Sequence, residues 1–178
     1  MGYTTDFTGR FEISPPMRPV HMNYINKFSN TRRMGRNALM VSKMPDPVRE
    51  AAGLPVGIQG GYYVGDTADF GQGRTNDILN YNREPEGQPG LWCQWVVNTE
   101  DMSEDGEGLY LEWNGAEKFY SYVEWLQYII KHFLQPWGYT INGTVEWQGE
   151  DSKDRGRIVV KDNVVRTQRA KFTFEDEE

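Results

Sequence analysis

The clearest hydrophobic pattern in the chain begins at Asn114, where large apolar residues start to recur every three or four positions. This spacing predicts one amphipathic helix, because residues three and four apart share a face of a helix with 3.6 residues per turn. Asn114 is the expected N-cap, and Glu117 occupies the reciprocal position of a capping box. Pro136 and Gly138 predict that the helix ends near Gln135.

The residues after this helix alternate between apolar and polar side chains. The alternation predicts a strand over residues 139–148 with one buried face. Asn142-Gly143 is also a strong signal for a hairpin turn, and that alternative stays open. We prefer the continuous strand, because the alternation runs unbroken through Gly143, where a glycine can mark a bulge or a close approach of two backbones.

Shorter patterns predict the remaining regular elements. The expected strands are 7–13, 91–97, 109–113, 157–161 and 164–174, and a helix is expected to begin at Pro19. Ser14-Pro15-Pro16 should break the first strand. The segment 91–97 is apolar at both odd- and even-numbered positions, so we expect a central strand that is covered on both sides. Asp162-Asn163 should form a tight hairpin turn.

Residues 35–90, here called the arm, carry five prolines and many glycines and predict an irregular segment. Within the arm we expect a short helix from Pro47 and a short strand around residues 62–64. A long irregular span inside a compact domain is often functional. We therefore expect the arm to wrap the sheet and to supply part of a binding surface.

Together the patterns predict one α+β domain, with an antiparallel sheet of about five to six strands and two helices on one face. The opposite face, here called the outer sheet face, should display rings, amides and carboxylates, and part of it should lie under the arm. Its expected residues are Trp92, Gln94, Tyr110, Glu112, Glu146 and Gln148. Residues 175–178 form an acidic tail.

The net charge is −7, with 19 Lys and Arg against 26 Asp and Glu. This excess of acids argues against broad nucleic-acid binding, which needs basic surface. Residues 18–49 nevertheless hold seven bases and one acid, whereas residues 100–117 hold seven acids and no base. Solvated surface is the simpler interpretation. The sharper one is a dipolar protein with a basic patch formed by Arg32, Arg33 and Arg36.

Candidate catalytic groups are few. His21 and His132 lie on separate expected helices, and Cys93 lies in an apolar strand, where thiols are inert. No zinc-ligand spacing occurs in the sequence, and we predict no cofactor and no metal. Glu112 and Glu146 are the catalytic candidates, because paired carboxylates on neighbouring strands can perform acid–base chemistry. The simpler interpretation is a pair of solvated strand residues, or acids paired with arginine.

Aromatic residues make up 13% of the chain, and rings with polar tips often carry the binding energy of protein interfaces. Strand ends and loops are where such contacts concentrate. The expected binding residues are Tyr62, Tyr63, Trp92, Gln94, Tyr110, Trp147, Gln148, Glu150, Asp151, Asp162 and Asn163. The alternative is that these aromatic rings complete the core.

Three segments resemble a family of uncharacterised bacterial and phage proteins: PGLWCQW, EKFYSYVEWLQYIIKHFLQPWGY, and INGTVEWQGED with GRIVVKDNVV. The resemblance covers roughly the C-terminal half and implies a cytoplasmic bacterial or phage setting, without an activity. The lone Cys93 also favours a reducing compartment, and the sequence shows no membrane-spanning run or signal peptide.

The expected function is that of a non-enzymatic binding protein that acts stoichiometrically on a protein partner, in the manner of a phage inhibitor or an immunity protein. The alternative is a small enzyme or ligand-binding protein that uses Glu112 and Glu146. Nucleic-acid binding through Arg32, Arg33 and Arg36 ranks last, and no membrane partner is expected. A homodimer stays open.

Overall fold

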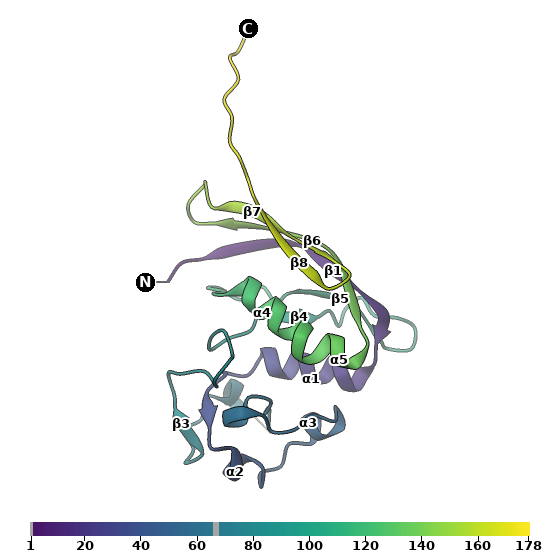
Figure 1. Cartoon of the computed structure of the whole chain (residues 1–178), viewed down its shortest axis with the longest axis vertical. Coiled ribbons are helices and arrows are strands. Elements are labelled where there is room, and N and C mark those ends of the chain that lie inside the picture. Colours follow the sequence, from purple (N-terminus) through teal and green to yellow (C-terminus); the bar gives the residue numbers. More distant parts are fainter. Residues whose placement is uncertain (1, 66–67) are drawn as a thin grey trace.

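The computed structural model describes residues 2–65 and 68–178, which form an α+β fold (Figure 1). In these residues a six-stranded antiparallel sheet, here called the main sheet, has the order β4-β5-β1-β6-β7-β8, and β2 pairs with β3 in a small sheet. The strands are β1 (Thr5–Met17), β2 (Gly35–Arg36), β3 (Ile78–Asn80), β4 (Trp95–Val97), β5 (Gly108–Trp113), β6 (Thr140–Gly149), β7 (Arg155–Lys161) and β8 (Val164–Arg169).

Helices cover one face of the main sheet (Figure 1). They are α1 (Pro19–Ser29) and a rod that consists of α4 (Tyr122–Ile129), a π turn (Ile130–Leu134) and α5 (Gln135–Trp137). The arm holds α2 (Ala38–Val41), α3 (Pro47–Ala51) and 3₁₀ turns at Ile58–Gly60 and Ala68–Gly71. No helix in the described part of the chain has the length and apolar character to cross a membrane. The predicted sheet with two helical rods on one face is confirmed.

The rod begins at Tyr122, so the predicted start at Asn114 is wrong. Lys118 and Ser121 have positive φ angles of 61° and 54°, which a right-handed helix does not allow. Asn114 closes a local turn instead, where its Oδ1 accepts a hydrogen bond from the backbone N–H of Ala116 at 2.9 Å. The capping pattern in the sequence therefore belongs to a turn that precedes the helix.

The rod passes through Pro136 before it ends. In a regular α-helix the proline ring would clash with the carbonyl oxygen of His132, four residues earlier. The wider π turn contains His132 and relieves that crowding. Gly138 then takes the predicted left-handed conformation, with φ 85°, and the helix ends at Trp137 rather than near Gln135.

β6 runs unbroken through Asn142-Gly143, which confirms the continuous strand and excludes a hairpin there. Gly143 has φ 147°, and a Cβ atom at this position would lie 2.7 Å from the carbonyl oxygen of Arg10 on β1. The glycine thus permits a close approach of two backbones. The hairpin lies at Asp162-Asn163, where both residues have positive φ angles of 49° and 67°, as type I′ turns require.

β1 is the central strand of the main sheet, between β5 and β6. It continues through Pro15 and Pro16 to Met17, so the predicted break at this point is wrong. Its pairing with β6 ends at Ser14, and its register with β5 shifts between Glu12 and Met17. Because both prolines fall where the ladders are interrupted, their missing N–H groups remove no regular ladder bond.

β4 is shorter than predicted and lies at the edge of the main sheet, not at its centre. Side chains of α1 cover that edge. The Asn26 amide donates to the Val97 carbonyl oxygen at 3.0 Å and accepts from the Val97 N–H at 2.7 Å. Ser29 Oγ donates to the carbonyl oxygen of Trp95 at 2.5 Å. The apolar character of residues 91–97 therefore reflects burial under a helix rather than a central position.

The arm lies on the far side of the helices from the main sheet (Figure 1). The prediction that it wraps the sheet and covers the outer sheet face is therefore wrong. The helix from Pro47 is confirmed, but residues 62–64 form no strand. The arm binds the helices through polar contacts, for example a hydrogen bond from the Tyr24 hydroxyl of α1 to the Tyr62 carbonyl oxygen at 2.8 Å.

The core lies between the main sheet and the helices and consists largely of aromatic rings. Trp95 packs edge-on against Phe7 and Phe119, with ring centroids 5.8 and 5.4 Å apart. Its indole N–H donates to the Tyr122 carbonyl oxygen at 2.8 Å, so the buried polar atom is satisfied. The high aromatic content thus serves mainly to fill this layer.

Candidate functional site

The outer sheet face is free of helices, because α1 and the rod lie on the opposite side of the main sheet (Figure 1). Phe11, Val145 and Ile158 point towards the helices and are buried. Their sequence neighbours point the other way, since successive side chains of a strand alternate between faces. The strand pairing places these residues on the outer sheet face: Thr8, Arg10, Glu12, Tyr110, Glu112, Thr144, Glu146, Gln148, Arg155, Arg157, Val159, Lys161, Arg166 and Gln168.

One side of this face is bordered by the acidic loop, residues 98–107, which joins β4 to β5. Asp101 of the loop pairs with Arg10 of β1 at 3.1 Å, and the Arg10 guanidinium lies 3.5 Å above the centroid of the Tyr110 ring. The Asn98 side-chain amide donates to Glu112 Oε1 at 2.6 Å. The acidic loop, rather than the arm, therefore covers the β5 side of the face.

The other side of the face is basic. Residues 155–171, which form β7, β8 and the start of the C-terminal segment, hold six bases and one acid. Arg157 donates through Nε to Gln168 Oε1 at 2.5 Å and lies opposite Glu146 in the strand register. These side chains and Arg155 line a shallow hollow of about 280 Å³. The face thus changes from acidic at the β4–β5 loop to basic at the β7–β8 hairpin.

Glu112 and Glu146 both lie on the outer sheet face. The expectation that they lie on neighbouring strands is wrong. Glu112 belongs to β5 and Glu146 to β6, and β1 runs between them. Two strand spacings put the backbones about 10 Å apart. Arg10 lies opposite Thr144 of β6, in the strand between the two acids. Because of this separation and the intervening cation, the two acids do not form a close carboxylate pair that could share a proton.

The predicted basic patch is absent from the surface. Arg33 and Arg36 are only 2% and 5% exposed, and Arg32 is half-buried. Arg36 forms an ion pair with Asp77 at 2.6 Å, and Arg33 donates to the carbonyl oxygens of Gly61 and Tyr63 at 2.7 and 2.9 Å. These arginines hold the arm in place and offer no surface to nucleic acid.

Several predicted binding residues are buried or, in the case of Asn163, half-buried. Trp147 lies on the helix-covered face of β6, where its indole N–H donates to Asp154 Oδ1 at 3.0 Å. Gln94 is buried and donates to the Glu117 carbonyl oxygen at 3.0 Å. Tyr63 is buried in the arm. Asn163 accepts from the Ile141 N–H at 2.7 Å and so ties the hairpin to β6.

The remaining predicted binding residues are at least partly exposed but lie far apart along the fold. They are Tyr62 in the arm, Trp92 before β4, Tyr110 on β5, Gln148, Glu150 and Asp151 at the β6–β7 turn, and Asp162 at the β7–β8 turn. Glu150 accepts from the backbone N–H of Thr4 at 2.6 Å, next to the N-terminus. Of the predicted binding residues, the outer sheet face holds Tyr110 and Gln148.

The two histidines form hydrogen bonds within the fold, and the cysteine is buried. Nδ1 of His132 lies 2.7 Å from the Tyr62 hydroxyl, and Nδ1 of His21 lies 2.7 Å from the Tyr139 hydroxyl. Burial, and in second place a nearby cation, lowers the pKa of both rings below 6.5. Burial raises the pKa of the Cys93 thiol to about 12, so it remains protonated and unreactive at neutral pH.

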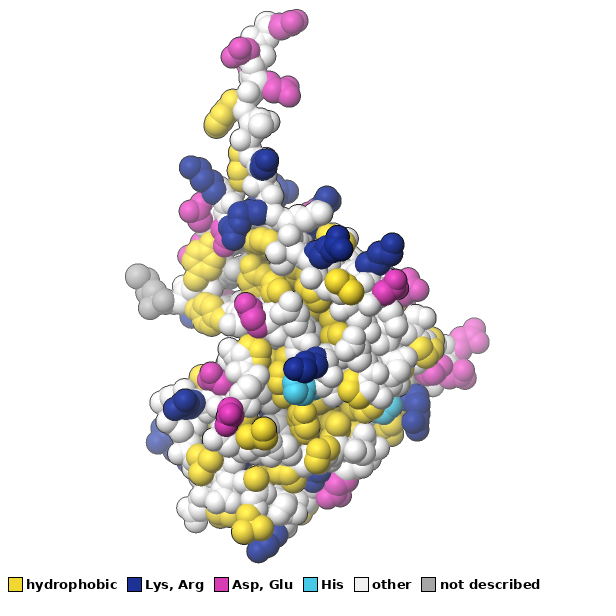
Figure 2. Space-filling model, in the orientation of Figure 1, with side chains coloured by type: hydrophobic (Ala, Val, Ile, Leu, Met, Phe, Trp, Pro, Cys, Tyr) yellow, Lys and Arg dark blue, Asp and Glu magenta, His cyan; other side chains and the backbone are white. Residues whose placement is uncertain are grey.

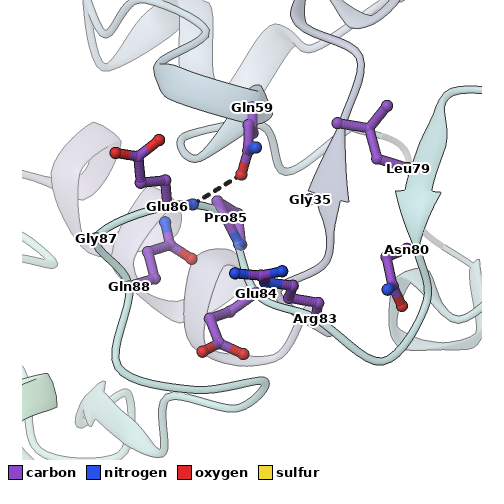
Figure 3. A pocket seen from close by; sticks show the side chains of 10 residues that line it. All are labelled: Gly35, Gln59, Leu79, Asn80, Arg83, Glu84, Pro85, Glu86, Gly87 and Gln88. Atoms are coloured by element: carbon purple, nitrogen blue, oxygen red, sulfur yellow. Dashed lines mark hydrogen bonds between the residues drawn. The ribbon is translucent and has the colours of Figure 1, made fainter.

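A hollow of about 600 Å³ lies in the arm. Figure 3 shows the side chains around it, among them Arg83, Glu84 and Gln59. Gln59 Oε1 accepts from the backbone N–H of Glu86 at 2.8 Å. Across residues 2–65 and 68–178 no group of three or more His, Cys, Asp or Glu side chains is placed to hold a metal ion. This hollow is thus a polar recess between loops.

A second recess, of about 510 Å³, lies beside Trp92 and is lined by Leu91 and Tyr120. Below it, the indole N–H of Trp125 is buried and has no hydrogen-bond partner among the described residues. It lies 3.7 Å from the position that a Cβ on Gly90 would occupy. Gly90 is also one of the residues that line the recess, and the Trp125 N–H has no access to solvent.

Comparisons of the chain with protein-family models, with curated proteins and with solved structures find no match. A function therefore has to be inferred from the geometry of the outer sheet face. The basic side of this face was not predicted, although the excess of six bases over one acid in residues 155–171 is nearly as large as that in residues 18–49. Charge counts alone do not separate the two segments, because they carry no information on burial.

Proposed function

We propose that the chain is a non-enzymatic binding protein that acts stoichiometrically on a protein partner through the outer sheet face, as an inhibitor or an immunity protein does. The supporting observation is the exposed mosaic on this face. Arg155, Arg157 and Lys161 lie on its basic side, and the acidic loop borders its other side. A partner surface with acidic groups opposite β7 would meet complementary charge across the interface.

The mosaic favours a protein over a nucleic acid as the partner. A phosphate backbone is uniformly negative and would be repelled by the acidic loop, which holds five acids between residues 98 and 107. Glu146 also lies directly opposite Arg157 in the main sheet. A protein surface can match both signs of charge, whereas a nucleic acid can match only one.

We place this activity in the cytoplasm of a bacterium or a phage-infected cell. The resemblance of three sequence segments to bacterial and phage proteins motivates that setting, although no family model and no curated protein matches the chain. The buried thiol of Cys93 needs no oxidising compartment, because it is the lone cysteine of the chain and forms no intrachain disulfide. Bacterial lysate is therefore the source in which to seek the partner.

The test is a pull-down from nuclease-treated bacterial lysate with the tagged chain and two charge-reversed variants. R157E/K161E reverses two exposed bases of the outer sheet face. K43E/R83E makes the same charge change at two exposed positions of the arm and serves as the control. We expect a discrete protein that the wild type and K43E/R83E retain and that R157E/K161E loses by about tenfold or more.

Two results would contradict the proposal. One is retention of the same proteins by all three baits, which would exclude the outer sheet face as the binding surface. The other is a bound fraction that disappears on nuclease treatment, which would identify the partner as a nucleic acid. Circular dichroism of each variant checks that the fold is intact.

A further inference from the structure

The two edges of the main sheet differ in how they are protected. Side chains of Asn26 and Ser29 bind the backbone at the edge of β4. At the opposite edge, β8 pairs with β7, and no described residue pairs with its other side. Exposed strand edges are templates for pairing with another strand, and folded proteins generally block them.

The backbone groups of this free edge can be assigned. Ala170 N–H donates to the Arg155 carbonyl oxygen at 2.9 Å. The ladder therefore uses the even-numbered residues of β8 towards β7, because hydrogen-bonded pairs alternate along an antiparallel pair. Val165, Thr167 and Arg169 thus present their N–H and C=O groups to the open side.

Beyond β8, the C-terminal segment (residues 170–178) projects away from the rest of the chain (Figure 1). The sequence predicted a strand that continues to Phe174, but within one chain the pairing ends at Arg169. Phe172 and Phe174 are 54% and 101% exposed. An extended segment with two exposed rings on one face has the pattern of a strand without its partner.

The charges of this region are divided between its two halves. Arg166, Arg169 and Lys171 lie in the first half, and residues 175–178 are all acidic. Figure 2 shows the basic side chains at the root of the projecting segment and the acidic ones towards its tip. Such a segment is complementary to itself when two copies run in opposite directions, since each basic half then faces an acidic half.

We propose that two copies of the chain associate through antiparallel pairing of residues 164–178 about a two-fold axis at Phe172. Arg166 then lies opposite the partner's Glu178, and Arg169 lies opposite the partner's Glu175. Each pair occurs twice, because a two-fold interface uses the same surface on both copies. The open edge of β8 gains a neighbour from the acidic half of the other copy, as in recognition by strand addition.

This register also places the exposed rings together. Phe172 faces the partner's Phe172 across the axis, and Phe174 lies opposite the partner's Ala170. All of these even-numbered residues share one face of the strand pair, so four phenylalanine rings form one row. In this register each odd-numbered residue lies opposite an odd-numbered residue of the partner. The backbone groups that point to the open edge can therefore form the hydrogen bonds of a regular ladder.

Neighbouring registers are less favourable. An axis at Lys171 sets the two lysines against each other, and an axis at Ala170 sets Arg169 against the partner's Lys171. An axis at Thr173 sets Arg169 against the partner's Glu177 and Lys171 against the partner's Glu175, but it gives Arg166 no partner among the acids at 175–178. Like charges directly opposite each other destabilise a strand pair. The axis at Phe172 pairs the longest part of β8 without such a contact.

The test is the mass of the full chain in solution, measured by light scattering after size exclusion and by sedimentation equilibrium. We expect the wild type to have twice the 20.6 kDa mass of one chain at low salt and to dissociate as the salt concentration rises. R166E/R169E and E175R/E178R should each be monomeric, with a dissociation constant raised roughly 100-fold.

An equimolar mixture of the two variants provides the decisive arm of the test. In the mixture every reversed charge meets an opposite one, so we expect the mass of a dimer to return. E104R/D105R, with the same change at two exposed acids of the acidic loop, should remain dimeric. A monomeric wild type, a dimer that survives R166E/R169E, or a mixture that stays monomeric would each overturn the proposal.

Discussion

The body of the molecule, formed by the main sheet, α1 and the rod, differs from the arm in the side chains that it buries. In the body the largest fully buried side chains are aromatic, such as Trp95, Trp125 and Phe11. In the arm the buried side chains include the ion pairs Arg36–Asp77 and Arg49–Asp46. The body is held by packing of rings and the arm by hydrogen bonds to buried charges.

The difference shows that an arginine can serve two purposes in one chain. Arg33 lies at the root of the arm, 4.1 Å below the Phe28 ring, with its N–H groups directed at backbone carbonyl oxygens. Arg157 and Lys161 are exposed on the outer sheet face. Neutralising a buried arginine should affect the stability of the fold, whereas reversing an exposed one should affect only binding.

The largest expected effect comes from breaking a buried pair in the arm. Asp46→Ala removes the partner of Arg49 at 2.7 Å and the acceptor of the Gly65 N–H at 2.9 Å. An uncompensated buried cation costs about 3–5 kcal/mol of the free energy of unfolding. Urea denaturation followed by circular dichroism measures this loss.

The matched control is Asp101→Ala, which breaks the exposed pair with Arg10. Pairs of this kind contribute about 0–1 kcal/mol, because water screens them and two long side chains must be ordered. Equal losses in the two variants would contradict the distinction between buried and exposed charges.

A smaller effect is expected in the body at Gly143, where β6 and β1 approach closely. Gly143→Ala would place a methyl group 2.7 Å from the Arg10 carbonyl oxygen and should cost about 1–3 kcal/mol. Gly106→Ala is the control, since Gly106 also has a positive φ of 74° but nothing lies within 4 Å of its Cβ position. Chemical denaturation should show the greater loss for Gly143→Ala, and the reverse order would count against the observed β1–β6 spacing.

The smallest effect concerns pH. Burial lowers the pKa of His132, which contacts Tyr62 of the arm, below the ordinary value of 6.5. The unfolded chain therefore binds a proton at higher pH than the folded chain does, so stability is full above pH 6.5 and is lost as pH falls through the folded pKa. Thermal unfolding at a series of pH values should show this loss, and His132→Phe should reduce it. An unchanged pH profile in that variant would exclude His132 as the source.

Apolar periodicity predicted the elements that bury one face. The existence of the rod, the strand through Gly143 and the turn at Asp162-Asn163 follow from residue spacing and turn chemistry, whereas the start of the rod at Tyr122 does not. The pairing of β1 between β5 and β6 was not predictable, since it joins Thr5 to Gly149 across most of the chain. Periodicity assigns a face to a strand but does not identify its neighbours.

The arm and the candidate site were harder to predict for a related reason. Charged residues are normally predicted to be exposed. Arg33 and Arg36 are buried instead, because carbonyl oxygens and a carboxylate accept hydrogen bonds from their guanidinium groups. Glu112 and Glu146 were assigned correctly to one face, but an intervening strand separates them. Sites that depend on tertiary contacts of polar groups leave little signal in a single sequence.

Site-specific photocrosslinking can show whether the outer sheet face contacts a protein partner. Val159 lies on this face between Arg157 and Lys161, and Leu79 is an exposed apolar residue of the arm. In bacterial lysate, Val159→p-benzoylphenylalanine should yield one discrete crosslinked protein, and Leu79→p-benzoylphenylalanine should not. A crosslinked protein from Leu79 alone, or none from Val159, would contradict the proposed contact.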